Sequence, residues 1–395
     1  MSEVEFSDKD EGIELAKRMA EEEEGIGRRP KGPSRFVIPT IAVAWSLFQL
    51  STASWLILDS TYIRAIHLAF AMLIVYLNYP LFKKARFGLT YWSQTDRIPI
   101  PDYVLAVVAA FSALYIVIDY EGLSMRYGTP ILRDLVIGAA LVLLLLEAAR
   151  RVIGPALSVI ASLFIVYAFA GPYMPEVIEF KGVSLNRLLG QLTMSTEGIY
   201  GIPLDVSATV VFLFVLFGAM LNKAGAGQYF IQLALSLLGR FKGGPAKAAV
   251  LGSGMTGLVN GSSIANIVTT GTFTIPLMKK VGYTPTKAAA IEVAASTDGQ
   301  LAPPIMGAAA FIIAEYVNVP YVEVSMAAAV PAFASYAALL FITPIEASTM
   351  GLRGMTKSEV PQFFKTLLAG AHFMLPIAML LYELIVVRHT PDTAA

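Results

Sequence analysis

The chain has 395 residues, of which 56% are hydrophobic and only 15% are charged, and its formal net charge is zero. Because a soluble domain carries about 25% charged residues, this composition indicates a membrane protein. A neutral chain offers no electrostatic attraction for nucleic acid. The absence of cysteine, together with three widely separated histidines, argues against thiol chemistry and a zinc or haem site, so no cofactor is expected.

A polar tail over residues 1–35 precedes the first apolar run and ends in the basic stretch RRPKGPSR. A signal peptide would place a short apolar core near the start of the chain, whereas here the first apolar run opens at Phe36 and is long enough to span. We therefore expect an uncleaved cytoplasmic tail.

Five apolar segments that follow could each cross a hydrocarbon core about 30 Å thick, which takes about 20 helical residues. They cover residues 36–58, 63–82, 103–118, 132–146 and 152–169. Basic residues lie at alternate ends, so the positive-inside rule places the amino terminus in the cytoplasm. A further span is expected over 206–221, between an amphipathic helix over 185–200 and a helix over 226–247 that lies along the cytoplasmic surface.

The apolar stretch 248–278 predicts a re-entrant hairpin. Lysines flank both of its ends, so both ends should be cytoplasmic. One helix of about 31 residues would rise about 46 Å and emerge on the far side, whereas two halves reach just past the middle of the core. The turn is expected at residues 260–263, where glycine permits unusual backbone angles and Ser and Asn supply oxygens. A glycine-rich packing face in an ordinary helix pair is the alternative.

A second interrupted element is expected over residues 284–317. The stretch TDGQLAPPIMG places Pro303 and Pro304 about halfway across the membrane, and proline both removes a backbone donor and clashes with the preceding turn. The helix should unwind there and resume at Ile305. Two interruptions at one depth are typical of secondary transporters, in which helix ends and unwound carbonyls hold an ion and an anionic substrate. A kinked helix without a binding role is the alternative.

From about Ile66 to Ala347 these stretches also carry a family resemblance. The most specific are GIYGIPLDVSATVVFLFVLFGAML, GRFKGGPAKAAVLGSGMTGLVNGSSIANIVTTGTFTIPLMKKVGY and AASTDGQLAPPIMGAAAFIIAEYVNVPY. The chain resembles the fused permease of a tripartite ATP-independent periplasmic (TRAP) transporter, of the type paired with a TAXI solute-binding protein.

The resemblance implies an all-α polytopic membrane protein in the plasma membrane of a prokaryote. Residues 36–150 would form a small-subunit-like bundle of four helices, fused to part of an elevator-type inverted-repeat transport region over 151–395. It further implies sodium-coupled import of a small carboxylate that an extracytoplasmic solute-binding protein delivers. The partners would then be this binding protein, the carboxylate and membrane lipid, with no nucleic acid and no enzymatic activity.

The family's roles fall on matching positions at the two interruptions. The resemblance implies substrate and ion binding by the hairpin tip and by the unwound segment that faces it: Asn260, Gly261, Ser262, Ser263 and Asn266, with Ser296, Thr297, Asp298, Gly299, Pro303, Pro304 and Gly307. Because sodium prefers oxygen ligands, the metal donors would be carbonyls or side-chain oxygens of Gly261, Ser262, Ser263, Asp298 and Gly299. The helix that starts near Ser263 would point its positive end at a substrate carboxylate.

Acidic residues in apolar surroundings form a separate group of candidates. Glu292, Glu315 and Glu383 lie in or near apolar spans, where ionisable groups are costly and often functional, although an interfacial or paired structural role is the favoured interpretation for each. Asp298 is expected to hold a cation and to cap the exposed amides of the helix that resumes after the break.

The chain departs from the family in three ways. The family usually has Ser at the position of Asn260 and Gly at that of Asp298. The transport region is normally an inverted repeat, whereas this sequence contains one half and a linking helix over 367–387. We therefore expect a fragment of a longer protein, a permease that another chain completes, or an inactive truncated remnant.

Two other function classes stay open. A cation antiporter or channel would also use broken helices and a buried Asp, but would need no binding protein. A membrane-embedded enzyme would need a convergent nucleophile and base, and the one close carboxylate pair, Glu292 and Asp298, is six residues apart and so not on one helical face. The G-x-G-x-x-G spacing at Gly252 is not a dinucleotide site, because no acidic residue occurs between Asp205 and Glu292.

The hairpin can be tested by labelling, because the absence of cysteine allows single cysteines to be introduced cleanly. Cysteines placed at Lys247 and at Lys280 should react with a membrane-impermeant maleimide from the same, cytoplasmic, side. Labelling of the two positions from opposite sides would contradict a re-entrant hairpin.

Overall fold

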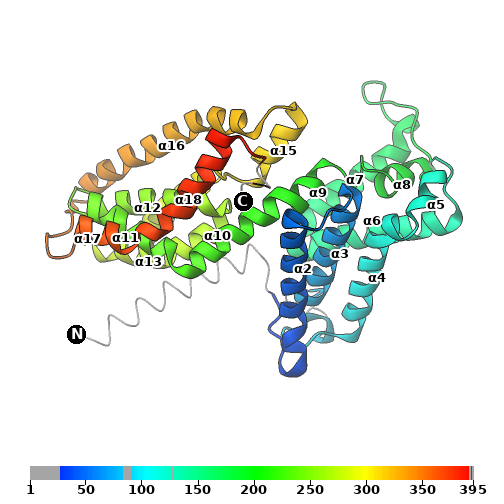
Figure 1. Ribbon diagram of the computed structural model, residues 1–395, viewed down its shortest axis with the longest axis horizontal. Coiled ribbons are helices and arrows are strands. Elements are labelled where there is room, and N and C mark those ends of the chain that lie inside the picture. The colour runs from blue at the N-terminus through cyan, green and yellow to red at the C-terminus, as the bar shows by residue number, and fades with distance from the viewer. Residues whose placement is uncertain (1–26, 83–89, 127, 391–392, 394–395) are drawn as a thin grey trace. The chain divides into compact units, whose positions relative to one another are not determined.

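The computed structural model describes residues 27–82, 90–126, 128–390 and 393. Within these ranges every regular element is a helix (Figure 1). Residues 1–26 of the predicted polar tail lie outside the described part. The described residues divide into two compact units, which meet in sequence at Thr209 and Val210.

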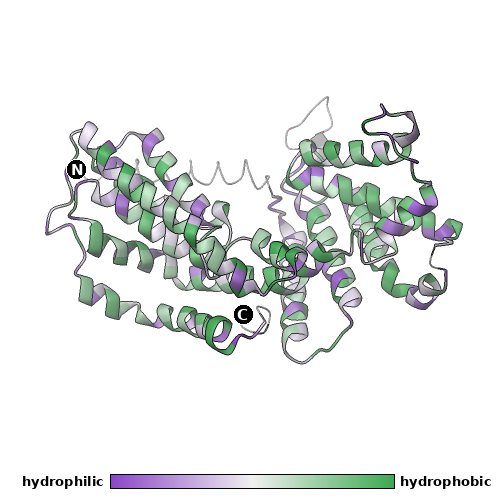
Figure 2. Ribbon diagram, turned by 90° about the horizontal axis from the view of Figure 1, so that it is seen from above, coloured by the Kyte–Doolittle hydropathy of each residue, from purple (hydrophilic) through white to green (hydrophobic). Residues whose placement is uncertain are grey.

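Six helices in the described part are long and apolar enough to cross a membrane, and much of the ribbon carries the green of hydrophobic residues (Figure 2). They cover Gly32–Ser54, Ser60–Asn78, Ile100–Ile118, Pro155–Tyr173, Ile202–Ala224 and Tyr321–Thr349. The prediction of an all-helical multi-pass membrane protein is therefore confirmed. The last of these spans, which contains Pro331 and Pro344, was not predicted from the sequence.

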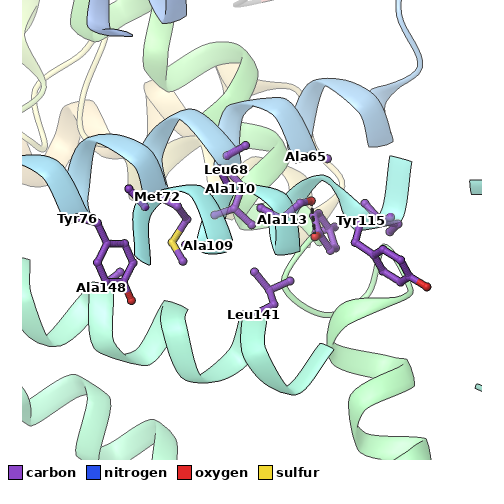
Figure 3. Packing of buried hydrophobic residues seen from close by; sticks show 14 of the residues in the cluster. Ala65, Leu68, Met72, Tyr76, Ala109, Ala110, Ala113, Tyr115, Leu141 and Ala148 are labelled. Carbon is purple, nitrogen blue, oxygen red and sulfur yellow. Dashed lines mark hydrogen bonds between the residues drawn. The ribbon is translucent and has the colours of Figure 1, made fainter. Parts of the chain in front are cut away.

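In the first unit, three helices surround one core: α3 (Ser60–Asn78), α4 (Ile100–Ile118) and α6 (Leu132–Val152). Alanines on α4 let it approach α3 closely, while Tyr76 and Met72 from α3 point toward Leu141 and Ala148 on α6 (Figure 3). Tyr76 is fully buried, and its hydroxyl donates to the carbonyl of Leu144 at 2.8 Å. The small buried side chains of α4 and the larger ones of α3 and α6 thus form one core.

The remaining helices of this unit include several that contact the three core helices. They are η1 (Gly32–Phe36), α2 (Val37–Ser54), η2 (Thr90–Ser93), α5 (Tyr120–Met125), α7 (Pro155–Ala170), η3 (Gly171–Tyr173), α8 (Leu185–Thr193) and α9 (Ile202–Val206). Both α7 and α8 contact α6. The division at residue 150 between a small-subunit-like region and a transport region stays a prediction, because compactness alone does not test it.

A buried ion-pair network lies at one end of the three core helices. Asp102, in the first turn of α4, accepts hydrogen bonds from Arg28 and, at 2.9 Å, from Arg151 of α6, and all three side chains are fully buried. Arg28 also donates to the carbonyls of Tyr76 and Leu77 at the end of α3. One carboxylate therefore ties the segment before η1 to all three core helices.

The opposite ends of α4 and α6 carry a second, more exposed network. Arg126 donates to Asp119 at 2.7 Å and to Asp134 at 3.1 Å. Asp134 also accepts from the Tyr115 hydroxyl at 2.5 Å. The Arg126 guanidinium, assisted by Arg133, lowers the pKa of the Asp119 carboxyl below its usual range.

A polar contact crosses the apolar interior beside α9. In η4 (Ser207–Val211), a turn of π-helix, the carbonyl of Ala208 accepts a hydrogen bond from the Gln49 amide of α2, and the Ser207 hydroxyl lies 3.2 Å from His67 Nε2 of α3. Such wide helical turns free backbone groups for side chains from neighbouring helices.

The second unit is built around α12 (Gly244–Asn260), which contacts α10 (Phe212–Ala224), α11 (Ala226–Leu238), α13 (Ser263–Lys280), α14 (Pro285–Asp298) and α16 (Tyr321–Thr349). The long α16 runs beside this group and follows α15 (Ala308–Val317) (Figure 1). The last helices of the second unit are α17 (Phe363–Ala369), η5 (Ala371–Phe373), α18 (Met374–Leu381) and η6 (Tyr382–Val387).

Outside the two predicted interruptions, three predicted helices differ clearly from the observed ones. The amphipathic helix ends at Thr193 rather than Tyr200, because the chain turns back and the Ile199 amide donates to the Leu192 carbonyl. Eight of the 13 residues of α11 are buried, so this helix packs within its unit instead of only lining a surface.

The third difference is in the linking helix, which is not continuous. It bends by 55° between α17 and the helical segment Ala371–Val387. At this bend Gly370 lies against the ring of Tyr229, where a Cβ would come within 2.1 Å of a ring carbon. A side chain at this position would clash with Tyr229, so the close packing of α11 against the bend requires a glycine here.

The buried network around Asp102 predicts a measurable cost. Asp102→Asn leaves two buried guanidinium groups without their anionic partner, so the first unit should lose about 3–5 kcal/mol of unfolding free energy. Thermal unfolding of the purified protein in detergent would measure the loss. The exposed Glu176 supplies the matched control, because Glu176→Gln should change the unfolding temperature very little; equal effects of the two substitutions would contradict the structural role of the network.

Candidate functional site

The first element of the candidate site is the turn between α12 and α13. The first helix ends at Asn260, and Gly261 follows with a φ of +59°, a conformation that side chains disfavour. Ser262 is extended, and its hydroxyl accepts the Ala265 amide at 3.3 Å, which caps α13. The side chain of Asn260 lies outside the described part of the structure. The membrane depth of this turn stays a prediction.

The second element is the chain between α14 and α15, where residues 299–307 are not in a regular helix. The helix ends at Asp298, and the Gly307 amide donates back to the Gln300 carbonyl at 2.8 Å, which folds the segment into a compact loop. The hydroxyl of Tyr321 donates to the carbonyls of Pro304 and Ile305, both at 2.7 Å.

These contacts explain where the helix resumes. The sequence predicted a restart at Ile305, whereas α15 begins at Ala308. The carbonyls before Met306 are held outside a helix by Tyr321, and Met306 itself has a φ of +56°, which a right-handed helix cannot accommodate. The partner that delays the restart comes from α16, which no local pattern around Pro303 and Pro304 reveals.

The two interruptions lie against each other. A Cβ built on Gly257 would come within 2.7 Å of the Gly299 Cα, so the backbones of α12 and the unwound segment touch there. The carbonyl oxygen of Met306 lies against Gly261. The Gln300 side chain donates to the Ser263 hydroxyl at 3.0 Å, from the unwound segment to the first residue of α13. The structure thus brings together the predicted hairpin tip and the predicted unwound segment.

Asp298 lies at the edge of this contact. Its carboxylate accepts a hydrogen bond from the Ser335 hydroxyl of α16 at 2.6 Å. The expectation that Asp298 caps the resumed helix is wrong, because the N-cap of α15 is Gly307 and has no side-chain cap. The last turn of α14 directs this carboxylate toward α16 instead.

Three other predicted residues lie within the helices rather than at the breaks. Asn266 is fully buried in the first turns of α13, where its amide donates to the carbonyl and hydroxyl of Ser253. Ser296 is buried in α14, 2.9 Å from the Ser253 hydroxyl. Thr297 is exposed and donates to the carbonyl of Val293 one turn earlier. Asn266 and Ser296 therefore join the two elements behind the tip.

Three hydroxyl-bearing residues behind the tip, Ser253, Thr270 and Thr274, escaped the sequence analysis. Asn266, Thr270 and Thr274 follow one another at intervals of four residues, so they share one face of α13, and this face contacts Glu292 of α14. The spacing was visible in the sequence. What it could not show was that Glu292, Ser253 and Ser296 lie opposite that face.

The tip has the chemistry of an oxygen-rich binding site. Main-chain carbonyls at Gly261 and Met306, the hydroxyls of Ser262 and Ser263, and the first-turn amides of α13 lie close together. Hydroxyl and carbonyl oxygens suit a small hard cation, while the amino-terminal end of an 18-residue helix attracts an anion. Among the described residues, no group of three or more His, Cys, Asp or Glu side chains could hold a metal ion.

Comparison with known proteins identifies the family to which the chain is similar. Residues 140–395 match the model of the tripartite ATP-independent periplasmic transporter, DctM component. The chain is 26% identical over 268 residues to the isethionate TRAP transporter permease protein DctMQ of Oleidesulfovibrio alaskensis, a match that covers 64% of this chain and 39% of that protein.

Two further relatives are TRAP transporter large permease proteins. The C4-dicarboxylate protein DctM of Vibrio cholerae is 35% identical over 91 residues, 23% of this chain and 20% of its own length. The 2,3-diketo-L-gulonate protein YiaN of Escherichia coli is 22% identical over 157 residues, 40% of this chain and 36% of its own. The matches thus cover between a fifth and two fifths of these three relatives.

The contact between Gly257 and Gly299 predicts a strong size limit. Gly257→Ala would force the unwound segment away from α12, and such overpacking costs about 1–3 kcal/mol of unfolding free energy. Gly307→Ala is a matched control in the same segment, since its Cβ would meet its nearest neighbour at an ordinary 3.5 Å. Unfolding in detergent should separate the two variants, and a Gly257→Ala protein as stable as Gly307→Ala would show that the backbones do not touch.

Proposed function

The chain belongs to the family of DctM components of tripartite ATP-independent periplasmic transporters, and we propose that it forms the membrane permease part of a sodium-coupled importer of a small carboxylate. The membership of this family rests on the match over residues 140–395. The coupling ion, the substrate class and the delivery by a TAXI-type binding protein are the proposal.

One observation carries the proposal: the turn at Gly261 and the unwound segment at 299–307 are in contact. In secondary transporters, substrate and ion bind where discontinuous helices meet. A glycine-rich packing face in an ordinary helix pair would not need two helix breaks whose backbones approach closely, whereas a channel, like an antiporter, would also use broken helices. The alternative of an antiporter uses the same architecture, so it must be separated by experiment.

We assign sodium to the tip. Its ligands would be oxygens of Gly261, Ser262 and Ser263 together with Asp298 and Gly299, all of which lie at or beside the contact between the two elements. Asp298 would take part by exchanging its hydrogen-bond partner, the neutral hydroxyl of Ser335, for the cation. The carbonyl of Met306, which the sequence did not suggest, is a further oxygen within this group.

The carboxylate would bind beside the ion at the start of α13. The amides in the first turn of a helix have no partner within the helix, and the helix dipole favours a negative group there. An extracytoplasmic solute-binding protein would deliver the substrate to a permease in the prokaryotic plasma membrane with a cytoplasmic amino terminus. Several relatives carry names of TRAP permeases for organic acids, which supports this class of substrate.

Uptake into proteoliposomes tests the proposal. The permease, supplied with any further chain that it requires, should accumulate radiolabelled succinate or another labelled small carboxylate only with both a sodium gradient and the cognate binding protein present. Ser263→Ala removes one oxygen without removing the cap of α13, so the sodium concentration for half-maximal uptake should rise about tenfold, or about 1.4 kcal/mol.

Ser348→Ala provides the matched control, because Ser348 is exposed and donates only to the carbonyl of Pro344 in its own helix. This variant should keep the parent's sodium dependence. Strong uptake without a binding protein would favour an antiporter or simple carrier, and an unchanged sodium dependence in both Ser263→Ala and Asp298→Asn would remove the sodium assignment at the tip.

A further inference from the structure

Glu292 is a fully buried carboxyl group in the middle of α14. Its Oε1 accepts hydrogen bonds from the hydroxyl of Thr270 and, at 3.2 Å, of Ser296, and its Oε2 accepts from the hydroxyl of Thr274 at 2.5 Å. Gly271 makes room for the group, since a Cβ there would meet the Glu292 Cγ at 3.3 Å. All of its hydrogen-bond partners in the described structure are neutral hydroxyls.

The other fully buried carboxylates in the described part of the chain form ion pairs with arginine. Asp102 is paired with Arg28 and Arg151, and Asp134 is paired with Arg126. An ionised carboxylate removed from water is costly by several kcal/mol unless a cation or a set of strong donors compensates it. Glu292 has no such cation among its contacts, so its neutral, protonated form is the favourable one.

The hydroxyls around Glu292 suit a neutral acid. The hydroxyl of Thr270 lies 2.7 Å from the carbonyl of Asn266, and that of Thr274 lies 3.1 Å from the carbonyl of Thr270. The hydroxyl of each threonine can therefore donate to a carbonyl of its own helix while its oxygen accepts a hydrogen bond from the Glu292 carboxyl group. A carboxylic acid needs one acceptor for its O–H and one donor for its C=O, and this cluster supplies both.

The basic residues on the helices around Glu292 either contact other groups or lie in a different turn from Glu292. On α12, Lys247 lies over the ring of Phe241, and on α14, Lys287 pairs with Glu346 of α16. Lys279 and Lys280 are in the last turn of α13, beyond Thr274.

The titratable groups that do lie near Glu292 are acidic or neutral. Asp298 is on the same helix, and Tyr336 of α16 donates to the carbonyl of Ala295. The two glutamates of α16 are elsewhere on that helix: Glu323 is in its first turn, and Glu346 pairs with Lys287. A negative charge on Asp298 would oppose a second negative charge on Glu292.

We propose that Glu292 is a proton-binding site that joins the hairpin to the broken helix. A proton from water forms an O–H bond with one carboxylate oxygen, and the site then carries no charge. Thr270 and Thr274 belong to α13 and Ser296 to α14, with Ser253 of α12 hydrogen-bonded to Ser296 behind them. Loss of the proton would leave a buried negative charge at the point where the three helices meet, which would favour their separation.

This site is distinct from the proposed sodium site. None of the hydrogen-bond partners of Glu292 is among the proposed sodium ligands. The inference therefore does not depend on the transported substrate or on the sodium coupling. Its test likewise needs no transport measurement, so its failure is separate from a failure of the proposed function.

Infrared spectroscopy of the full chain in lipid nanodiscs tests the inference, because a protonated carboxyl absorbs separately from a carboxylate. The parent at neutral pH should show a protonated-carboxyl band that disappears in Glu292→Gln and persists in Glu315→Gln, in which an exposed acid is replaced. Adding sodium should leave the band unchanged. A parent without a band assignable to Glu292, or a band that sodium removes, would overturn the inference, the second result in favour of a cation site.

A second pair of variants covers the case in which Glu292→Gln does not fold. Thr274→Val keeps the side-chain volume but removes the hydroxyl that contacts Oε2, so the carboxyl band should shift to higher wavenumber. Thr274→Ser keeps the hydroxyl and should leave the band where it is in the parent. A band at the same position in all three proteins would show that the absorbing carboxyl is not Glu292.

Discussion

The close approach of Gly257 to Gly299 is the contact on which the second unit depends. A Cβ on either glycine would fall within 2.8 Å of the other's Cα, so only two residues without side chains allow the unwound segment to rest directly on α12. Once this contact is made, Gly261 meets the carbonyl of Met306, and Gln300 reaches Ser263. The geometry of the candidate site follows from a packing constraint rather than from any charged pair.

The polar groups near that contact form two sets, one at the tip and one further along the helices. At the tip are main-chain carbonyls, serine hydroxyls and helix amides. The oxygens can exchange their present partners for a cation, and the amides can exchange theirs for an anion. Further along the helices, Ser253, Asn266 and Ser296 connect α12, α13 and α14, and Glu292 closes this series. Buried polar groups in an apolar setting must be satisfied, so such a network holds helices in one register while remaining sensitive to any change in charge.

The first unit compensates its buried polar groups in a different way, by ion pairs. Its buried aspartates are neutralised by arginines at the helix ends, which fixes the helices firmly and leaves a core of alanine, leucine and tyrosine between them. Charges paired in this way favour a rigid support. The second unit instead has glycines, hydroxyls and helix breaks, which are the features expected of the part that binds and releases a ligand.

The sequence by itself determined the membrane class, most of the spans and the positions of both helix breaks, because hydropathy, glycine and proline act locally on the backbone. It did not predict α16, whose internal prolines interrupt the pattern, nor the bend at Gly370, which lies against the ring of Tyr229 from another helix. Tertiary structure alone decided that α15 resumes at Ala308, that Asp298 faces Ser335, and that Glu292 is surrounded by hydroxyls from α13 and α14. Each of these outcomes depends on side chains that come from another helix, and local sequence carries no information on which helix will lie opposite.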